Sequence, residues 1–498
     1  MRKILMRAAL NPLKNPSVHE VVLKNLVGGN AGNMVFAYSV IRTLLREDTV
    51  IDTTTTLTPF SDEEVERINA EYDCFVLPLA NAFRSTFKKE LAVLISLVKR
   101  LRIPCVVVGV GVQANVDESI NTEFDFDELA KEFVKEVLEK SEIIGVRGEI
   151  TAEYLKKLGF TEERDFTVIG CPSMYIHGDE IPLKTPVDLN ENSLVSVNRK
   201  INIPAALHEF LVKESNKFKN YMYVPQGIDD LLLLYAGVPI DRNKYPNIYE
   251  KNYPWELNSE ICASGHEIGF TSVPSWMKFL GSRDFSFGTR IHGNITAVVS
   301  GIPAFIFVPD SRILELARYH NIQYMLAKEI TDETDIFKIY ERADFYRVQR
   351  GHKERFYHYL DFLEKNNLPH IFMEDRSNKH ARLDDIVSNF DVSDGITAFN
   401  RVSIDEQTER MAHYSQHMRE TIAELKSTRN LLNKRNIKVE AENQRLNEYI
   451  ESLGLLRKVD SCTKAVKNPN LVKLYIQKKL GKDVAEKVKI EKRKSKLL

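Results

Sequence analysis

The segment at residues 285–310, FSFGTRIHGNITAVVSGIPAFIFVPD, constrains the fold of this chain more than any other stretch. One short apolar run opens the segment, a second (residues 304–308) closes it, and residues 295–300 between them have a helix-like composition. We therefore predict the order strand, loop, helix, turn and strand, which is the repeating unit of parallel α/β sheets. Ligands of such sheets bind outside the carboxyl ends of the strands, where the loop after the first strand must lie.

That loop carries Arg290 and His292, immediately ahead of Gly293. A permanent cation beside a titratable imidazole can hold an anionic group and move a proton. The alternative is structural: Arg290 pairs with a core carboxylate, and His292 caps the helix that begins near Asn294. The functional interpretation is favoured by position, because a strand end next to a glycine and ahead of a helix N-terminus suits an anion.

The run GTRIHGNITAVVSGIPAFIF, followed by VPDSRILELARYHNI, resembles the polysaccharide pyruvyl transferase family. That family carries an R-x-H-G segment, a G-[IV]-P turn and a D-x-[KR] ahead of a helix. By this reading the resemblance covers residues 28–330. It implies a transferase that moves the enolpyruvyl carbons of phosphoenolpyruvate onto two hydroxyls of a sugar as a ketal. It also implies that phosphoenolpyruvate is a co-substrate and that no metal or organic cofactor is needed.

The resemblance assigns roles to the residues of the loop. Arg290 would bind phosphoenolpyruvate, together with Gly293 and Asn294 of the same loop. His292 is the candidate catalytic residue, a general acid/base with an unperturbed pKa of about 6.5.

Two further arginines would supply positive charge to the same substrate. Arg147 follows a predicted short strand (residues 143–146) and precedes a helix, although it could instead pair with Glu149. Arg312 stands where the family most often has Lys. The charge is kept there, but Arg stays protonated, so a role in proton transfer is not expected of it.

Two glycine-rich turns are expected to line the same cleft. The first follows an apolar segment (residues 21–27), which we interpret as a strand, and precedes a helix-like run; no G-K-[ST] follows, so it is not a Walker loop. The second fits G-x-G-x-x-A at residues 109–114, but polar residues follow it in place of a helix, which argues against a dinucleotide site. An ordinary tight turn remains the alternative for the first. The family has comparable turns, matched here by Asn30, Gly32, Asn33, Gly109 and Gly111.

A length of 498 residues suggests about three domains. Strand and helix patterns alternate through two halves, which predicts two Rossmann-like domains facing a cleft, as in GT-B glycosyltransferases. The predicted divisions are an N-terminal domain (1–185), a C-terminal domain with the R-x-H-G loop (186–375), a linker (376–402), a coiled coil (403–456) and a basic tail (457–498). Residues 332–365 are expected to be helices that complete the second domain and cross back to the first.

The predicted coiled coil rests on an apolar residue at every seventh position, and the alternative is a long helix packed on its own body. We expect homo-oligomers through this helix. The series is Ile404, Met411, Met418, Leu425, Leu432, Val439, Leu446 and Leu453.

Charge and cysteine content bear on location and partners. The formal net charge is only −1, yet residues 457–498 hold 14 Lys and Arg against 4 Asp and Glu. This tail could lie on an anionic membrane surface or be a solvated end, and no folded motif accompanies it that would indicate nucleic-acid binding. The five cysteines form no C-x-x-C pair, which is typical of reduced thiols and indicates no metal site. With no signal peptide or spanning segment in the sequence, we expect a cytoplasmic protein, with peripheral contact at the inner membrane face through the tail.

The acceptor implied by the resemblance is a sugar of a surface polysaccharide or its lipid-linked precursor. Two other functions stay open. One is a glycosyltransferase of the same architecture that uses a nucleotide sugar, although no acidic ribose-binding strand end is evident. The other is a non-catalytic scaffold built on the coiled coil, which the presence of Arg290 and His292 argues against and the Arg at position 312 mildly favours.

Overall fold

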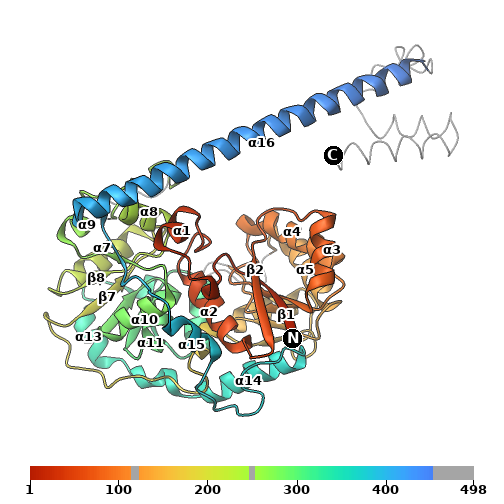
Figure 1. The fold of residues 1–498 in the computed structure, drawn as a ribbon. Helices are drawn as coiled ribbons and strands as arrows, with labels where there is room; N and C mark the ends of the chain where they lie inside the picture. Colours follow the sequence, from red (N-terminus) through yellow and green to blue (C-terminus); the bar gives the residue numbers. More distant parts are fainter. Residues whose placement is uncertain (114–122, 246–252, 453–498) are drawn as a thin grey trace. The chain divides into compact units, whose positions relative to one another are not determined.

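The structure is a computed structural model that describes residues 1–113, 123–245 and 253–452, without the side chains of residues 446–452 (Figure 1). The chain divides into one compact unit, Met1–Tyr414, and a second unit, Ser415–Leu498. Both predicted α/β halves lie within the first unit. The predicted basic tail (457–498) lies outside the described residues.

The first half is built on a parallel four-stranded sheet with strand order β2-β1-β3-β4. A short parallel pair, β5 and β6, continues from this sheet through a bridge between Val110 and Val146. The strands are β1 (Arg2–Arg7), β2 (Thr49–Thr54), β3 (Cys74–Pro78), β4 (Cys105–Val108), β5 (Ile144–Val146) and β6 (Phe166–Val168). The helices of this half are α1 (Val18–Leu23), α2 (Gly32–Leu44), α3 (Asp62–Glu71), α4 (Lys88–Arg100), α5 (Asp127–Leu138) and α6 (Glu149–Lys157).

The second half is built on a parallel five-stranded sheet with strand order β12-β11-β10-β7-β8. Its strands are β7 (Val195–Asn198), β8 (Met222–Tyr223), β10 (Phe285–Gly288), β11 (Ala304–Val308) and β12 (Gln323–Leu326). Its helices are α7 (Ala205–Ser215), α8 (Ile228–Ala236), α9 (Glu260–Ser264), α10 (Val273–Gly281), α11 (Ile291–Val299), α12 (Ser311–Tyr319) and α13 (Ile336–Arg342). The strand, loop, helix, turn and strand predicted for residues 285–310 are β10, its loop, α11 and β11. The helix begins at Ile291, four residues earlier than its composition indicated.

Short 3-10 helices punctuate both halves. They are η1 (Pro12–Lys14), η2 (Ser85–Phe87), η3 (Pro172–Tyr175), η4 (Arg242–Lys244), η5 (Ala327–Glu329), η6 (Phe345–Gln349) and η7 (Phe399–Arg401).

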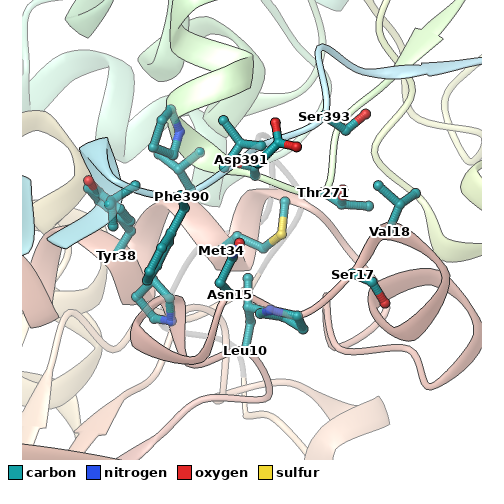
Figure 2. Close-up of a pocket in the computed structure, with 17 residues that line it drawn as sticks. Leu10, Asn15, Ser17, Val18, Met34, Tyr38, Thr271, Phe390, Asp391 and Ser393 are labelled. Atoms are coloured by element: carbon teal, nitrogen blue, oxygen red, sulfur yellow. The ribbon is translucent and has the colours of Figure 1, made fainter.

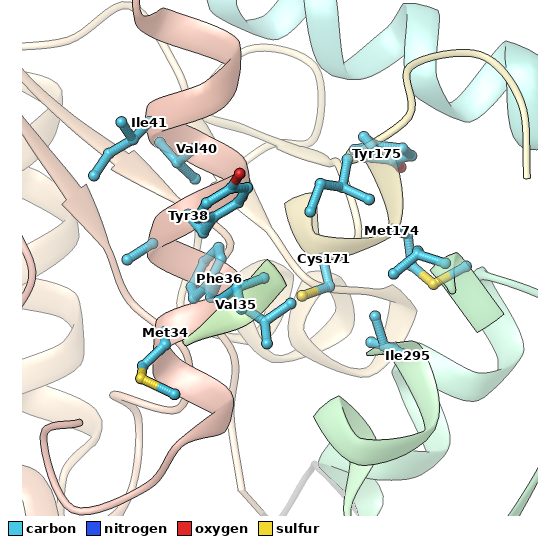
Figure 3. Close-up of a cluster of buried hydrophobic side chains, with 14 of the residues drawn as sticks. Met34, Val35, Phe36, Tyr38, Val40, Ile41, Cys171, Met174, Tyr175 and Ile295 are labelled. Atoms are coloured by element: carbon cyan, nitrogen blue, oxygen red, sulfur yellow. The ribbon is translucent and has the colours of Figure 1, made fainter. Parts of the chain in front are cut away.

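Helix α2 joins the two halves into one core. It packs against η3 of its own half and against α10 and α11 of the other. Figure 3 shows side chains of α2 meeting Cys171, Met174 and Ile295. Nearly every residue of α2 is buried, including Phe36 and Tyr38. Helix α2 therefore lies inside the protein, and its first residue, Gly32, is buried with it.

The chain crosses back to the first half after the second sheet, as predicted. Helix α14 (His352–Lys365) inserts Phe362 beside Gly145 of β5. Just beyond it, the Asn366 side chain accepts hydrogen bonds from the backbone N–H groups of Glu142 and Ile143.

The segment predicted as a linker (376–402) is structured. It forms α15 (Arg382–Ser388) and β13 (Ile396–Thr397), and β13 pairs antiparallel with β9 (Ile268–Gly269). Arg42 of α2 holds Asp384 of α15 at 2.7 Å. The polar composition of this segment misled the prediction, because a few buried apolar residues anchor it, among them Leu383, Val387 and Ile396.

The prediction of a strand at the apolar residues 21–27 is wrong. This segment belongs to α1 and the turn after it, while the strand of this region is β1 at the N-terminus. Ser17 and Glu20 form a capping box at the start of α1. The S-x-x-E signature of that box was present in the sequence and outweighs the short apolar run.

Helix α16 (Ile404–Ser452) is a single helix of 49 residues, as expected of the heptad series. Described members of that series are exposed along it, Ile404 at 79% and Leu425 at 64%. Pairing with a second copy stays a prediction. None of the helices in the described ranges is long and apolar enough to cross a membrane. Four of the five cysteines are buried free thiols, and Cys462 lies outside the described residues.

Candidate functional site

Five basic side chains from separate loops come together around His292, and we refer to them as the cation cluster. Arg147 and Arg312 act electrostatically on His292 itself. Arg84, Arg290 and Arg312 act on Lys200, and Arg312 also acts on Arg84 and Arg147, which links the five into one group. Three of the five were predicted from the sequence and two were not. The cation cluster consists of Arg84, Arg147, Lys200, Arg290 and Arg312.

His292 lies in the first turn of α11, pressed against the start of α2. A Cβ atom on Gly32 would come within 2.7 Å of the Cβ of His292, so only glycine fits there. The ring of Phe36 stacks beside the imidazole with centroids 6.4 Å apart. The Nε2 atom lies 3.6 Å from the sulfur of Cys171. The imidazole is thus fixed on several sides by α2 and η3.

The protonation state of His292 differs from the expected one. Burial lowers its pKa to about 3, with Arg147 and Arg312 adding to the effect. The imidazole is therefore neutral at physiological pH, with one ring N–H and one ring nitrogen that can accept a proton. The pKa of His292 therefore lies below the ordinary value of about 6.5, and its role as general acid/base stays a prediction.

Arg147 is the most deeply buried cation of the cluster, with only 2% of its surface exposed. Its Nε donates a hydrogen bond of 3.0 Å to the carbonyl of Gly109, and its guanidinium lies 5.9 Å from the centre of the Phe36 ring. Its Nη2 has no hydrogen-bond partner among the described residues. The predicted alternative, pairing with Glu149, is not formed. Burial lowers the pKa of Arg147. Leaving the buried Nη2 donor without a partner costs about 1–3 kcal/mol.

The two predicted cleft glycines of the second turn make room for this arginine. Gly109 has a φ of +69° and turns its carbonyl to Arg147. A Cβ on Gly111 would come within 2.8 Å of Cδ of Arg147 and 3.1 Å of a Glu315 oxygen. The two glycines of the G-x-G motif therefore allow the close approach of Arg147 and Glu315.

Glu315, which sequence reasoning missed, is the acidic partner near Arg147. Its carboxylate accepts from the backbone N–H of Thr151 at 3.0 Å and from the Thr151 hydroxyl at 2.9 Å, so it caps α6 across the two halves. Burial raises the pKa of Glu315 to about 7. Its negative charge is therefore only partly present at neutral pH, which leaves the site with a surplus of positive charge.

Arg290 and Arg312 are more open than Arg147. The backbone N–H of Arg290 donates to Asn198 at 2.8 Å, and its Nε donates to the carbonyl of Arg199 at 3.2 Å. Arg312 forms a fork with Asp310 through contacts of 3.0 Å from Nε and from Nη2. With its amide oxygen turned toward the cluster, Asn81 accepts from Arg312 at 3.3 Å and from Arg84 at 2.9 Å.

Asn294 and Gly293, predicted to bind substrate, both make close contacts within the protein. The Asn294 amide donates to the carbonyl of Arg290 at 3.0 Å, and its oxygen accepts from the hydroxyl of Ser286. Asn294 is fully buried, so it holds the loop in shape. A Cβ on Gly293 would meet Gln226 at 2.5 Å, which explains the glycine by close packing.

The first glycine-rich turn is held by its own asparagines. Asn30 accepts from the N–H of Gly32 at 2.8 Å, and Asn33 donates to the carbonyls of Val27 and Gly28. Among the predicted residues of this turn, Gly32 is the one in contact with the site, through His292.

Lys200 and Arg84 belong to the cation cluster but were not among the site residues predicted from the sequence. Lys200 lies two residues beyond the end of β7, and Arg84 lies in the loop between β3 and α4. Both follow strands at the carboxyl edge of their sheets, which was the available signal. Several polar residues follow each strand, and the sequence does not tell which of them points into the site.

A cavity of about 250 Å³ lies elsewhere, on a different face of α2 (Figure 2). Met34 and Tyr38 line it, along with Val18, Val273 and Phe390, whereas Gly32 and Phe36 face His292. None of the predicted site residues lines this cavity. Within the described ranges, no group of three or more His, Cys, Asp or Glu side chains is placed to hold a metal ion.

Residues 30–311 match the family described as polysaccharide pyruvyl transferase. The matched stretch is more than half of the chain, and it begins at the Asn30 turn and ends at Ser311, the residue before Arg312. The chain belongs to the polysaccharide pyruvyl transferase family. Membership confirms the resemblance seen in the R-x-H-G loop and makes this protein a transferase by family. A search of curated proteins gives no match.

Solved structures show distant similarity to this family member. An uncharacterized protein from Klebsiella pneumoniae is 12% identical, with a TM-score of 0.34 over 65% of this chain and 92% of that one. A UDP-GlcNAc 2-epimerase from Methanocaldococcus jannaschii is 10% identical, with a TM-score of 0.39 over 73% of this chain and 99% of the other. MnaA from S. aureus, solved with UDP, is 9% identical, with a TM-score of 0.35 over 73% and 98%. Likeness at this level carries no argument about activity.

Proposed function

We propose that this protein transfers the enolpyruvyl group of phosphoenolpyruvate to two hydroxyls of a sugar, as a ketal, with release of phosphate. The observation that carries the proposal is the buried guanidinium of Arg147, whose Nη2 lacks a partner among the described residues. A buried cation left in this state is a site for an anion.

The charge of the cluster suits a ligand with two anionic groups. Arg147, Arg290 and Arg312 present planar donor forks, which match carboxylate and phosphate in geometry. Arg312 is half engaged by Asp310, and Glu315 is partly protonated near neutral pH. The surplus of positive charge would be neutralised by the phosphate and the carboxylate of phosphoenolpyruvate.

The neutral imidazole of His292 suits the acceptor side of the reaction. After protonation of the methylene carbon, C2 of the substrate becomes electrophilic and a sugar hydroxyl attacks it. A base must take the proton of that hydroxyl, and His292 is in the form that can accept it. The pKa of His292 rises as the anionic ligand offsets the positive field of Arg147 and Arg312.

The donor can be tested by calorimetry. The purified protein is titrated with phosphoenolpyruvate and, separately, with UDP-sugars, GDP-sugars and NAD. Phosphoenolpyruvate alone is expected to bind, and Arg290→Ala is expected to weaken that binding by about tenfold or more. Arg164→Ala is the control, since that exposed arginine pairs only with Asp165 in the described contacts. Binding of a nucleotide sugar in place of phosphoenolpyruvate would move the protein to a glycosyltransferase function.

The wider setting is part of the same proposal. We propose that the two α/β halves are GT-B-like domains and that the acceptor enters between them. The proposed acceptor is a sugar of a surface polysaccharide or of its lipid-linked precursor. The exposed apolar series on α16, including Met418 and Leu432, supports pairing with a second copy of the chain.

A further inference from the structure

The proposed transfer requires a proton for the methylene carbon, and this inference rests on that proposed function. Four members of the cation cluster are arginines, which stay protonated and are poor donors. His292 is neutral, so it lacks the acidic proton of an imidazolium. The remaining member of the cation cluster is an amine, Lys200.

Lys200 is tied to the R-x-H-G loop by the backbone. Its N–H donates a hydrogen bond of 3.0 Å to the hydroxyl of Thr289, the residue before Arg290. Thr289 is fully buried, so the attachment point is fixed. The Lys200 side chain is 24% exposed, which places it on the side of the cluster that a substrate can reach.

No close ion pair holds the Lys200 amine. Its Nζ lies 4.0 Å from Asp310, the outer limit of such contacts, and Asp310 is already engaged by the fork of Arg312. The charged groups that act on the amine are Arg312 and Asp310 at the start of α12, Arg290 ahead of α11, and Arg84 from the first half. Three cations therefore oppose one carboxylate.

This environment makes Lys200 a group that titrates near the working pH. Its pKa is lowered to about 8 by burial first and then by Arg312, Arg290 and Arg84, while Asp310 opposes them. An arriving phosphate and carboxylate would reverse that balance and favour the charged ammonium. An amine with such a pKa can give up its proton readily, since the best acids and bases titrate near the operating pH.

Glu315 is the acidic group next to Arg147 whose pKa lies near neutral pH, and its geometry excludes it as the donor. Both of its oxygens accept hydrogen bonds from Thr151, and the residue is 2% exposed. Its carboxyl group therefore faces the start of α6. Asp230 is similarly engaged, because it accepts from the hydroxyl of Tyr253 and from the N–H of Gly227.

We propose that Lys200 is the proton donor of the site, becoming charged as phosphoenolpyruvate binds and delivering its proton to the methylene carbon. The double bond supplies the electron pair for the new C–H bond and leaves C2 cationic. The first sugar hydroxyl bonds to C2 and gives its proton to His292. The C2–O bond to phosphate then breaks, the electron pair leaves with phosphate, and His292 returns its proton to that oxygen.

The second sugar hydroxyl accounts for the remaining bond and proton. Its oxygen bonds to C2 and closes the ketal, and its proton restores the ammonium of Lys200. Two hydroxyl protons are consumed, one ending on the new methyl group and the other on hydrogen phosphate. No oxidant, reductant or further reactant is needed.

The role of Lys200 is tested by counting protons during phosphoenolpyruvate binding. Calorimetric titrations at pH 8.5 in Tris and in borate, which differ in ionisation enthalpy, give the number of protons taken up. With a pKa of about 8, roughly three quarters of the Lys200 amines are neutral at this pH, so the wild-type protein should take up as much as that fraction of a proton. Lys200→Arg should bind with an affinity within about threefold of wild type, because the charge is kept, and should lose that uptake.

Two control variants show whether the proton taken up on binding goes to Lys200. Lys278→Arg, at a position 79% exposed, should keep the wild-type uptake, and Glu315→Gln should keep most of it. Binding with unchanged uptake in Lys200→Arg, or uptake lost in Glu315→Gln instead, would overturn the role of Lys200 and leave the proposed function standing. Absence of phosphoenolpyruvate binding in the wild-type protein would count against the proposed function itself, and the role of Lys200 would fall with it.

Discussion

Gly32 and His292 are in contact: a methyl group on Gly32 would stand 2.7 Å from the Cβ and 2.8 Å from the Nδ1 of His292. The two residues come from different halves of the first unit, one at the start of α2 and one in the first turn of α11. Phe36, one turn further along α2, stacks beside the same imidazole. The position of the candidate base is therefore set by the packing of α2.

Gly32→Ala should displace His292 and destabilise the protein. Overpacking of this kind costs about 1–3 kcal/mol, since neither helix backbone can move freely. Chemical denaturation measures the change. The control is Gly281→Ala at the end of α10, where the nearest atom to a new Cβ is a carbonyl oxygen at 3.4 Å and little loss is expected. Equal stability of the two variants would contradict the close contact.

His292 should make the protein less stable as the pH falls. Its pKa is about 3 in the folded protein and about 6.5 when unfolded, so below pH 6.5 the unfolded chain binds a proton that the folded chain does not. The loss from this group reaches about 2 kcal/mol at pH 5. Denaturation of the wild-type protein and His292→Gln is compared from pH 7.5 to pH 5. The variant should lose less stability over that range, and parallel curves would show that His292 titrates normally.

Glu315→Gln should tighten phosphoenolpyruvate binding at pH 8. Burial raises the pKa of Glu315 to about 7, so at pH 8 its carboxylate is mostly charged and opposes an anion. The amide can still accept from the N–H of Thr151. Removing the charge is expected to contribute about 1 kcal/mol, or about fivefold in affinity.

The same variant should behave like the wild type at pH 6, where Glu315 is mostly protonated. Calorimetry at the two pH values checks this difference. An affinity ratio between variant and wild type that is the same at pH 6 and pH 8 would show that the charge of Glu315 does not act on the ligand.

The sequence predicted the R-x-H-G loop well because local patterns determine it. Alternating apolar runs and glycines defined β10, α11 and β11 to within a few residues. Family motifs picked out Arg147, Arg290 and Arg312, and the structure places Arg312 within electrostatic reach of Arg147 and, with Arg290, of Lys200. What local patterns cannot give is the environment: the shift of the pKa of His292 depends on burial beneath α2, which lies more than 240 residues earlier in the chain.

The misses have the same origin. Lys200 follows Asn198 and Arg199, and the sequence does not show which of the three side chains turns toward Arg312. Asn294 was expected to touch substrate, yet its neighbours on β7 and β10 consume its hydrogen bonds. Glu315 lies one turn beyond Arg312 on α12, but its partner Thr151 belongs to the other half.

The apolar series on α16 should hold two or more chains together. Leu425 and Leu432 belong to the heptad series and are 64% and 52% exposed. Replacing both with Asn should convert an oligomer to a monomer of 57.3 kDa in sedimentation equilibrium. Ile437→Gln is the control, because that residue is 65% exposed but lies outside the series. A wild-type monomer at micromolar concentration would contradict this prediction.

The most direct test of the account is Arg147→Met, measured for stability without ligand and for phosphoenolpyruvate binding. Removing a buried guanidinium whose Nη2 is unpartnered should leave the stability unchanged or raise it by up to about 3 kcal/mol. The same change should weaken phosphoenolpyruvate binding by about 100-fold. Arg102→Met, at an exposed arginine paired with Glu66, should alter neither quantity greatly. Tight phosphoenolpyruvate binding by Arg147→Met, together with a loss of several kcal/mol in stability, would show that Arg147 serves the fold and would contradict the account.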